Sequence, residues 1–503
     1  MRSAARLRTR NKMKEGKGKP NIVFILTDDQ GAWAMHCAGN EEIRTPNLDR
    51  LAKEGMRFEN FFCTSPVCSP ARASILTGRI PSQHGVHDWI RSGNLDRESL
   101  GGKKEDPYYA SEGKAIPYLE GMLTYTDVLA ANHYSCALAG KWHLGDSRNP
   151  QHGFTRWYTI ARGGCQYYKP DMIEDGELHF DNQYVTDLIT EKAISYLDTM
   201  SGEEPPFYLS IHYTAPHDPW DEDQHPGEFV ELYRDCSFRS VPDLPVHPNQ
   251  IESAPSGTGE VRKSLLRGYY AAVSAMDAGV GKILDRLDEL GIRQNTIVMF
   301  MADNGMNMGH HGIWGKGNGT FPFNLYDTAV KVPFLASWRG KIPEGITAES
   351  MHSQYDIIHT LLDLVQIPVE LPENLPGKSF KEVLLTGDQK DDGEVVVYDE
   401  YGPNRMIRTR EWKLIHRYPY GPDELYHLSC DPRETDNLIG RKEYETVEKE
   451  LLDRLTRWFI RYADPKMDAS REGVTGFGQL CRPGWYSQGS STYAKSEKYQ
   501  NKE

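Results

Sequence analysis

Three apolar segments of the 503-residue chain each run directly into a cluster of polar side chains. The segments are 21–27, 206–213 and 296–301, and the clusters that end or follow them are Asp28-Asp29, His212 to His217 and Asp303-Asn304. Runs of this kind, apolar on both faces, are typical of strands buried within a parallel sheet. Ligands of such sheets bind where the strands end. We therefore expect the three polar clusters to converge in space.

Helical patterns lie between these strands. A Thr-Pro start, two leucines three residues apart and a closing glycine predict a short helix within 45–55. Further helices are expected over 124–132, 183–199 and 261–290, with another strand over 134–139. Strands that alternate with helices indicate an open α/β fold. We expect a large domain whose mostly parallel, doubly wound sheet is flanked by helices.

The pattern changes beyond a helix expected over 353–365, where several prolines and a glycine follow one another. Short strand-like runs separated by turn residues come next, at 394–400, 405–409, 412–417 and 424–428. An amphipathic helix is then expected over 443–462. These features predict a smaller C-terminal α+β domain with an antiparallel sheet.

Residues 1–19 are strongly basic and carry no apolar stretch of the kind that an export signal needs. They are expected to form a flexible tail ahead of the α/β domain (20–379) and the C-terminal α+β subdomain with its polar tail (380–503). No signal peptide is visible, so the chain as written would be cytoplasmic, or periplasmic if its true start differs. Localisation therefore stays open.

Charge and composition exclude several classes of protein. The chain has 58 Lys and Arg against 72 Asp and Glu, a net charge of −14, which disfavours binding to the phosphates of nucleic acid. Its apolar runs are far shorter than the roughly 18–20 residues of a membrane-spanning helix. Eight cysteines lie at irregular spacings without a C-x-x-C pair, which argues against a zinc site or a disulfide scaffold.

The carboxylates at the strand ends are candidate metal ligands. Asp28, Asp29, Asp303 and Asn304 offer hard oxygen atoms, which suit Ca²⁺ or Mg²⁺ better than a soft metal. Asp-Asp-Gln-Gly and Asp-Asn-Gly are also common turn sequences, and either one alone would be read as a turn. Two such sites, together with a nearby cysteine motif, favour a metal site.

That motif is Cys68-Ser-Pro-Ala-Arg72, followed by Thr77-Gly-Arg79. It resembles the signature of the type I sulfatase family, C-x-P-x-R with a following T-G-R, within the alkaline phosphatase superfamily. Other segments over 21–340 resemble landmarks of the same family: Thr-Asp-Asp-Gln-Gly around Asp28, Gly140-Lys-Trp-His-Leu-Gly145, Ala215-Pro-His217, Asp303-Asn-Gly305 and His311-Gly-Ile-Trp-Gly-Lys316. Resemblance in the C-terminal domain is weaker.

The resemblance implies that Cys68 is oxidised after translation to formylglycine, whose hydrated gem-diol provides an oxygen nucleophile. It also implies that one Ca²⁺ is held by Asp28, Asp29, Asp303, Asn304 and the modified Cys68. The enzyme that performs the oxidation would be an oxygen-dependent formylglycine-generating enzyme or an anaerobic radical maturase. Ordinary thiol chemistry is therefore not expected at Cys68.

The same resemblance assigns roles to further polar residues. Arg72 would orient the formylglycine, one helical turn along if the helix begins near Pro70. Lys141 and Lys316 would grip the sulfate, because an anionic ester needs cations on its oxygens. His143 would act as base, and His217 would protonate the leaving alcohol together with Lys316.

Three alternatives compete with a sulfatase. A two-metal phosphatase of the wider superfamily typically has a Ser or Thr nucleophile and extra His ligands, whereas this chain has Cys68 and Asn304. A formylglycine-dependent phosphate or phosphonate monoester hydrolase stays open. A non-catalytic binder of sulfated glycans should have lost a motif residue, and every one is present here.

The motifs do not name the sulfate ester, which could be on an aryl, steroid, lipid or sugar group. The resemblance is greatest to bacterial exo-acting glycan sulfatases, so a sulfated saccharide is the expected substrate. Aromatic and polar residues outside the motifs offer stacking faces and hydrogen bonds for a sugar ring. The candidate substrate-binding residues are Arg162, Trp89, Trp220, His225 and His311, the last also a candidate neighbour of Lys316.

Overall fold

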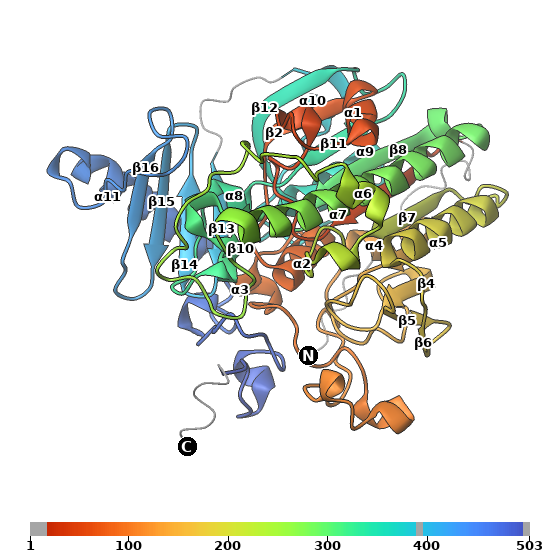
Figure 1. Cartoon of the computed structure of the whole chain (residues 1–503), viewed down its shortest axis with the longest axis horizontal. Coiled ribbons are helices and arrows are strands. Elements are labelled where there is room, and N and C mark those ends of the chain that lie inside the picture. Colours follow the sequence, from red (N-terminus) through yellow and green to blue (C-terminus); the bar gives the residue numbers. More distant parts are fainter. Residues whose placement is uncertain (1–17, 389–395, 496–503) are drawn as a thin grey trace.

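A computed structural model describes residues 18–388 and 396–495 of the chain. The basic segment 1–17, most of the expected flexible tail, lies outside these residues. The described chain forms one large sheet with helices on both faces and one small sheet to its side (Figure 1). None of the helices in the described ranges is long and apolar enough to cross a bilayer.

The large sheet has ten strands in the order β12-β2-β11-β8-β1-β7-β3-β4-β5-β6. Its centre, from β8 to β4, is parallel, and so is the β12–β2 pair. The strands β11, β5 and β6 run antiparallel to their neighbours. The strands are β1 (Asn21–Thr27), β2 (Met56–Phe62), β3 (Ser135–Gly140), β4 (Phe154–Ile160), β5 (Asp171–Glu174), β6 (Glu177–Phe180), β7 (Phe207–His212), β8 (Thr296–Ala302), β11 (Phe334–Ser337) and β12 (Ile346–Ser353).

Side chains of β1 alternate between two hydrophobic cores, because successive residues of a strand point to opposite faces. Ile22, Phe24 and Leu26 pack into one core, whereas Val23 and Ile25 pack into the other. The first core takes in α2 (Cys68–Thr77), α4 (Tyr125–Ala131) and α9 (Ile357–Leu364), and the second takes in α1 (Pro46–Lys53), α5 (Val185–Met200) and α7 (Gly259–Glu289). The expected doubly wound α/β fold is confirmed.

The expected helices and strands lie close to their predicted positions. The helix predicted over 353–365 begins later, at Ile357, because Ser353 caps a 3-10 turn over Gln354–Asp356. The remaining short elements are α3 (Pro81–His84), α6 (Gly227–Glu231), α8 (Asp327–Val330), α10 (Lys381–Thr386) and the β9 (Asn307–Met308) and β10 (Trp314–Gly315) pair.

The small sheet is an antiparallel meander, β13 (Val397–Tyr401), β14 (Asn404–Arg408), β15 (Trp412–Arg417) and β16 (Glu424–His427). The amphipathic helix α11 (Glu445–Tyr462) covers one face of it through Leu451, Leu455 and Phe459. The prediction of a small antiparallel α+β unit is confirmed. Beyond α11 the chain returns to the large domain, where Gln479 pairs with Ile90.

Candidate active site

The polar clusters at the ends of β1 and β8 meet at one edge of the large sheet. The carboxylates of Asp28, Asp29 and Asp303 each bring an oxygen within 4.8 Å of the others. The backbone N–H of Asp29 donates to Asp303 Oδ1 at 3.2 Å, and all three side chains are buried. The third cluster joins them through His217, whose Nε2 lies 3.6 Å from Asp29 Oδ2. The convergence expected from the strand pattern is confirmed.

Cys68 stands at the first position of α2 and faces this cluster. The helix begins at Cys68 itself rather than near Pro70, since Val67 before it is extended. Its Sγ lies 3.1 Å from Asp28 Oδ1 and 2.8 Å from Lys316 Nζ. Burial and the charge of Asp28 raise the pKa of the thiol well above its ordinary value. An unmodified Cys68 is therefore a neutral thiol, which is poorly suited to thiolate chemistry.

Arg72 lies one turn along α2 and is fully enclosed. Its Nε donates to Asp303 Oδ2 at 2.9 Å, and its Nη1 donates to the Lys141 carbonyl at 2.9 Å. Burial alone would lower the pKa of Arg72, but Asp303 and Asp28 raise it. A buried, permanently charged guanidinium thus ties the cysteine helix to the ends of β3 and β8.

Two lysines neutralise the aspartates on the other sides. Lys141, just after β3, forms a short ion pair with Asp28 Oδ2, and Lys316 Nζ lies 2.6 Å from Asp29 Oδ1. Burial would lower the pKa of Lys316, but Asp29 holds it well above its ordinary value. Lys141 and the aspartates are almost completely buried, so this is a concentrated set of charges in a low-dielectric environment.

His143 presents a free lone pair beside these charges. Its Nε2 is 2.9 Å from the Ile90 carbonyl, which can only accept, so Nε2 carries the ring proton. Its Nδ1 is buried and has no partner within the described part of the chain. Burial and Lys141 lower the pKa of His143 well below its ordinary value, so the ring is neutral. The backbone there is left-handed, with φ of 56°, a conformation typical of strained functional positions.

The donor set fits a calcium ion. Asn304 Nδ2 donates to Asp29 Oδ1 at 2.8 Å and to the Gly305 carbonyl, whereas the buried Asn304 Oδ1 has no partner among the residues described. An amide oxygen left without a partner beside three carboxylates is what a hard cation would complete, because Ca²⁺ takes only oxygen ligands of this type.

The predicted substrate-binding residues differ in burial, and two of them lie in the core. Trp220 and His225 are 2% and 3% exposed, and their ring N–H groups lie against the Pro216 and Pro219 carbonyls. They are packing residues, so the expectation of sugar-stacking faces there is not supported. Arg162 forms an ion pair with the buried carboxylate of Glu112 at 3.0 Å. Its charge is therefore already paired within the protein.

Trp89 and His311 keep partly exposed rings. The indole N–H of Trp89 donates to the Gly476 carbonyl at 3.0 Å, and the His311 ring stacks on Tyr326 at 3.9 Å between centroids. A role in binding substrate stays a prediction for both.

Two residues of the site, His212 and Gly163, belong to none of the sequence motifs. His212 ends β7, and its Nδ1 lies 2.8 Å from the Lys141 carbonyl. Burial lowers the pKa of His212 to about 3. The backbone of Gly163 packs directly against the His143 ring, because a Cβ at position 163 would lie only 2.0 Å from Nε2. The three-strand convergence signals His212 weakly, but nothing in the sequence signals Gly163.

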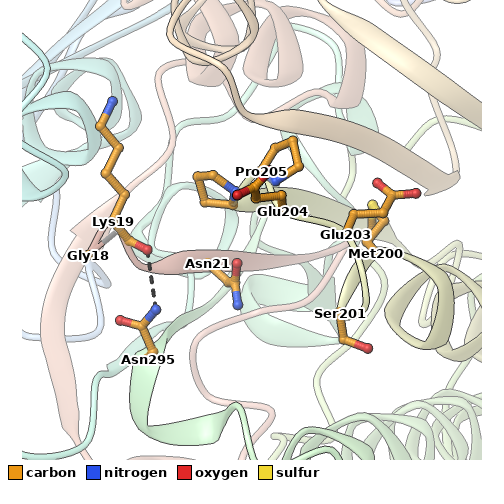
Figure 2. Close-up of a pocket in the computed structure, with 10 residues that line it drawn as sticks. Gly18, Lys19, Asn21, Met200, Ser201, Glu203, Glu204, Pro205 and Asn295 are labelled. Carbon is orange, nitrogen blue, oxygen red and sulfur yellow. Dashed lines mark hydrogen bonds between the residues drawn. The ribbon is translucent and has the colours of Figure 1, made fainter. Parts of the chain in front are cut away.

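A hollow at the opposite edge of the sheet has a different character. It is lined by residues that precede β1, β7 and β8, including Lys19, Pro205 and Asn295 (Figure 2). The Asn295 amide donates to the Lys19 carbonyl across it at 3.2 Å. None of the motif residues lines it, so the strand-end cluster is the candidate site.

The chain is similar to known proteins over most of its length. A sulfatase family model matches residues 20–367, and a model of the C-terminal part of N-sulphoglucosamine sulphohydrolase matches residues 309–460. An N-acetylglucosamine-6-O-sulfatase of Bacteroides thetaiotaomicron is 28% identical over 91% of this chain and 89% of its own length. An ulvan-active sulfatase of Formosa agariphila is 30% identical over 89% of this chain and 82% of its own.

One similar solved structure is of a protein in complex with its substrate D-glucosamine-2-N,6-O-disulfate. Its TM-score is 0.71 at 25% identity, and the match covers 90% of this chain and 99% of that one.

Proposed function

The chain belongs to the sulfatase family and is a sulfuric ester hydrolase, and from that premise we propose that it removes a sulfate ester from a saccharide in exo fashion. Similar proteins include an N-acetylglucosamine-6-O-sulfatase, an ulvan-active sulfatase and a protein solved with a glucosamine disulfate substrate, which supports the saccharide. We further propose that residue 68 acts as formylglycine, through its gem-diol, beside one Ca²⁺.

The observation that carries this proposal is the placement of Cys68 among groups of complementary function. Its Sγ lies beside Asp28 and Lys316, and nearby are a buried amide oxygen of Asn304 and a buried nitrogen of His143 that have no partners in the described ranges. Buried polar atoms usually have hydrogen-bond partners, so two such atoms without one beside Cys68 point to a role in binding or catalysis. When present, the formylglycine supplies the oxygen nucleophile and the calcium ion supplies positive charge next to it.

Asp28, Asp29, Asp303 and Asn304 would hold the ion together with residue 68. Lys141 and Lys316 would then bind the sulfate oxygens, where their fixed positive charges oppose the charge of the ester. Arg72 would hold the helix that carries residue 68 against Asp303.

Proton movements fall to the two histidines. The free Nδ1 of His143 would accept the proton from the hydroxyl of residue 68 that expels sulfate. His217 has a side chain 19% exposed, at the open side of the cluster, and would protonate the leaving alcohol together with Lys316. Each histidine would thus serve one proton transfer.

Maturation would precede folding. Cys68 is 2% exposed and lies at the buried start of α2, so a formylglycine-generating enzyme or radical maturase must reach it in the unfolded chain. A protein produced without either partner is expected to keep the thiol and to be inactive.

The test is free-sulfate release from defined mono- and disaccharides sulfated at 2-O, 3-O, 4-O, 6-O or N positions, together with aryl sulfates. The protein is co-produced with a maturase, and Asp303→Asn serves as the inactive control. Release from one sugar position supports the proposal, and preference for the terminal residue of an oligosaccharide supports exo action. Release from aryl sulfates alone overturns the saccharide assignment.

A further inference from the structure

Residues 89–91 form a short strand-like segment, with an isolated bridge between Ile90 and Gln479, that lies between the active site and a C-terminal segment, residues 475–480. In an extended backbone the N–H and C=O of one residue point to the same side, and those of the next residue point to the opposite side. Toward the site, the Ile90 N–H donates to Ser69 Oγ at 3.0 Å, next to Cys68. The Ile90 carbonyl accepts from His143 Nε2 at 2.9 Å. The backbone N–H and C=O of one residue, Ile90, thus contact both the cysteine helix and the His143 ring.

The other side of the strand is paired with Gln479. Its backbone N–H donates to the Trp89 carbonyl at 2.7 Å, and its carbonyl accepts from the Arg91 N–H at 2.9 Å. These bonds fix the groups that flank Ile90. The C-terminal segment, which the sequence predicts only as a polar tail, is therefore a backbone partner of the strand that holds His143.

The Gln479 side chain strengthens this contact. It is completely buried, and its Oε1 accepts from the N–H groups of His87 and Asp88 at 2.8 and 3.3 Å. Its Nε2 donates to the Gly85 and Cys481 carbonyls, both at 2.9 Å. Both amide donors and the amide oxygen are in use, so a single side chain fixes the course of residues 85–88.

The side chain of Asp88 also binds the C-terminal segment 475–480, through the segment's backbone N–H groups. Its Oδ2 accepts from the Gly476 and Gly478 N–H groups at 3.0 and 3.1 Å, and its Oδ1 accepts from the Tyr401 hydroxyl at 2.7 Å. The Gly476 carbonyl in turn accepts from Asn318 Nδ2 at 3.3 Å, two residues after Lys316. The C-terminal segment therefore touches both the His143 side and the Lys316 side of the site.

We propose that the C-terminal segment 475–480 positions the catalytic base, with Gln479 and Asp88 as positioning residues that hold the Ile90 carbonyl against His143. The role of His143 as base rests on the proposed function. Because a carbonyl at Nε2 keeps the proton there, Nδ1 stays free to accept a proton. Loss of the Gln479 bonds would let the strand shift and the ring tilt or change tautomer.

The experiment compares Gln479→Ala with the unaltered full-length chain, both matured, with the formylglycine content at residue 68 measured by mass spectrometry. The variant should lose about 10- to 100-fold in kcat with KM changed less than about twofold, because a small displacement of a catalytic group mainly affects the chemical step. An unchanged kcat overturns the proposal. A raised KM with unchanged kcat also overturns it, since that result would make the segment a substrate wall.

Two further variants separate positioning from general destabilisation. Gln83→Ala removes a buried amide that also binds two backbone groups, those of Ile80 and Asn374, and that makes no hydrogen bond to the described residues 85–91. Its kcat should be unchanged. Gln479→Glu keeps the acceptor oxygen and loses the two donor bonds, so its kcat should lie between Gln479→Ala and the unaltered chain. Equal loss of kcat in Gln83→Ala would contradict the proposal.

A second readout needs no substrate. Deuterium exchange at the imidazole C2 of each histidine, followed by mass spectrometry, reports burial and protonation of the ring. Exchange at His143 should be slow in the unaltered chain and faster in Gln479→Ala, while His212 stays unchanged. Unchanged exchange at His143 overturns the proposal. If the chain releases no sulfate at all, the proposed function fails and this exchange still decides the positioning role.

Discussion

Two clusters of buried charge in this protein use the same residue types for different purposes. One is the cluster at the ends of β1, β3 and β8. The other joins the large domain to the small sheet, where Lys413 bridges Asp327 at 2.9 Å and Glu434 at 2.7 Å, and Arg408 pairs with the second oxygen of Asp327 at 3.0 Å. In this junction cluster each cation meets a carboxylate from another element. It is a connection between two parts of the fold.

The strand-end cluster differs from the junction cluster in its buried polar atoms, two of which have no partner in the described residues. Asn304 Oδ1 and His143 Nδ1 are buried there and have neither a hydrogen bond nor an ion pair within residues 18–388 and 396–495, whereas Glu434 Oε1 in the junction cluster, which also has no hydrogen bond, is ion-paired with Lys413. The strand-end cluster also has a nucleophile position, Cys68, next to its charges. Burial of charge alone therefore does not mark a catalytic site, whereas unsatisfied polar atoms beside a reactive residue do.

The largest expected contrast is in catalysis. His143→Ala removes the proposed base and should lower kcat by about 10²- to 10⁴-fold, the usual contribution of a general base. Its thermal unfolding midpoint should fall as well, because the buried ring leaves a cavity and an unpaired Ile90 carbonyl, so kcat is compared per folded molecule. Sulfate release and circular dichroism on the same preparations check both points. A kcat within about threefold of the unaltered chain would remove His143 from the mechanism.

Substitutions in the junction cluster should lower the stability of the fold and leave catalysis unchanged. Lys413→Met leaves Asp327 and Glu434 with one cation fewer in a buried place, which should lower the free energy of unfolding by about 3–5 kcal/mol. Urea unfolding measures the loss, and kcat per folded molecule should be unchanged. A variant that keeps its stability and loses its activity would mean that the two clusters act together.

Added calcium should stabilise the folded chain through the strand-end cluster and not through the junction cluster, and this effect should be smaller than the two above. At about 100 times its dissociation constant, the ion should stabilise the folded chain by about 2.7 kcal/mol in urea unfolding. Asn304→Ala should weaken binding by about 10- to 100-fold or more. Asp327→Asn, in the junction cluster, should keep the full calcium-dependent shift. The absence of any shift in the unaltered chain would contradict a calcium site at the strand ends.

The parts of the molecule that the sequence predicted are those with local signals. The buried strand Asn21–Thr27 is a continuous apolar run, the long helix α7 has a helical pattern of apolar residues, and the Cys68 motif is dense enough to identify the family. The antiparallel strands at the margins of the sheet have no comparable pattern. For example, β6 (Glu177–Phe180) has only four residues, and none of them is fully buried.

The partners of the candidate site depend on tertiary contacts, which leave little trace in the sequence. Gln479 lies in a polar, glycine-rich stretch that predicts an exposed tail, yet it is completely buried against residues 85–91. Trp220 has an aromatic side chain of the type that stacks on sugars, but it is buried in the core. Residue type gives the chemistry that is available, and packing decides which side chains can reach a substrate.

A comparison of a sulfate ester and a phosphate ester of one sugar alcohol, using matured protein and Cys68→Ala, decides whether the chain is a sulfatase that depends on formylglycine. We expect sulfate release that exceeds phosphate release, that scales with the fraction of residue 68 found as formylglycine, and that disappears in Cys68→Ala. Preferential hydrolysis of the phosphate ester, or undiminished sulfate release by Cys68→Ala, would contradict this expectation.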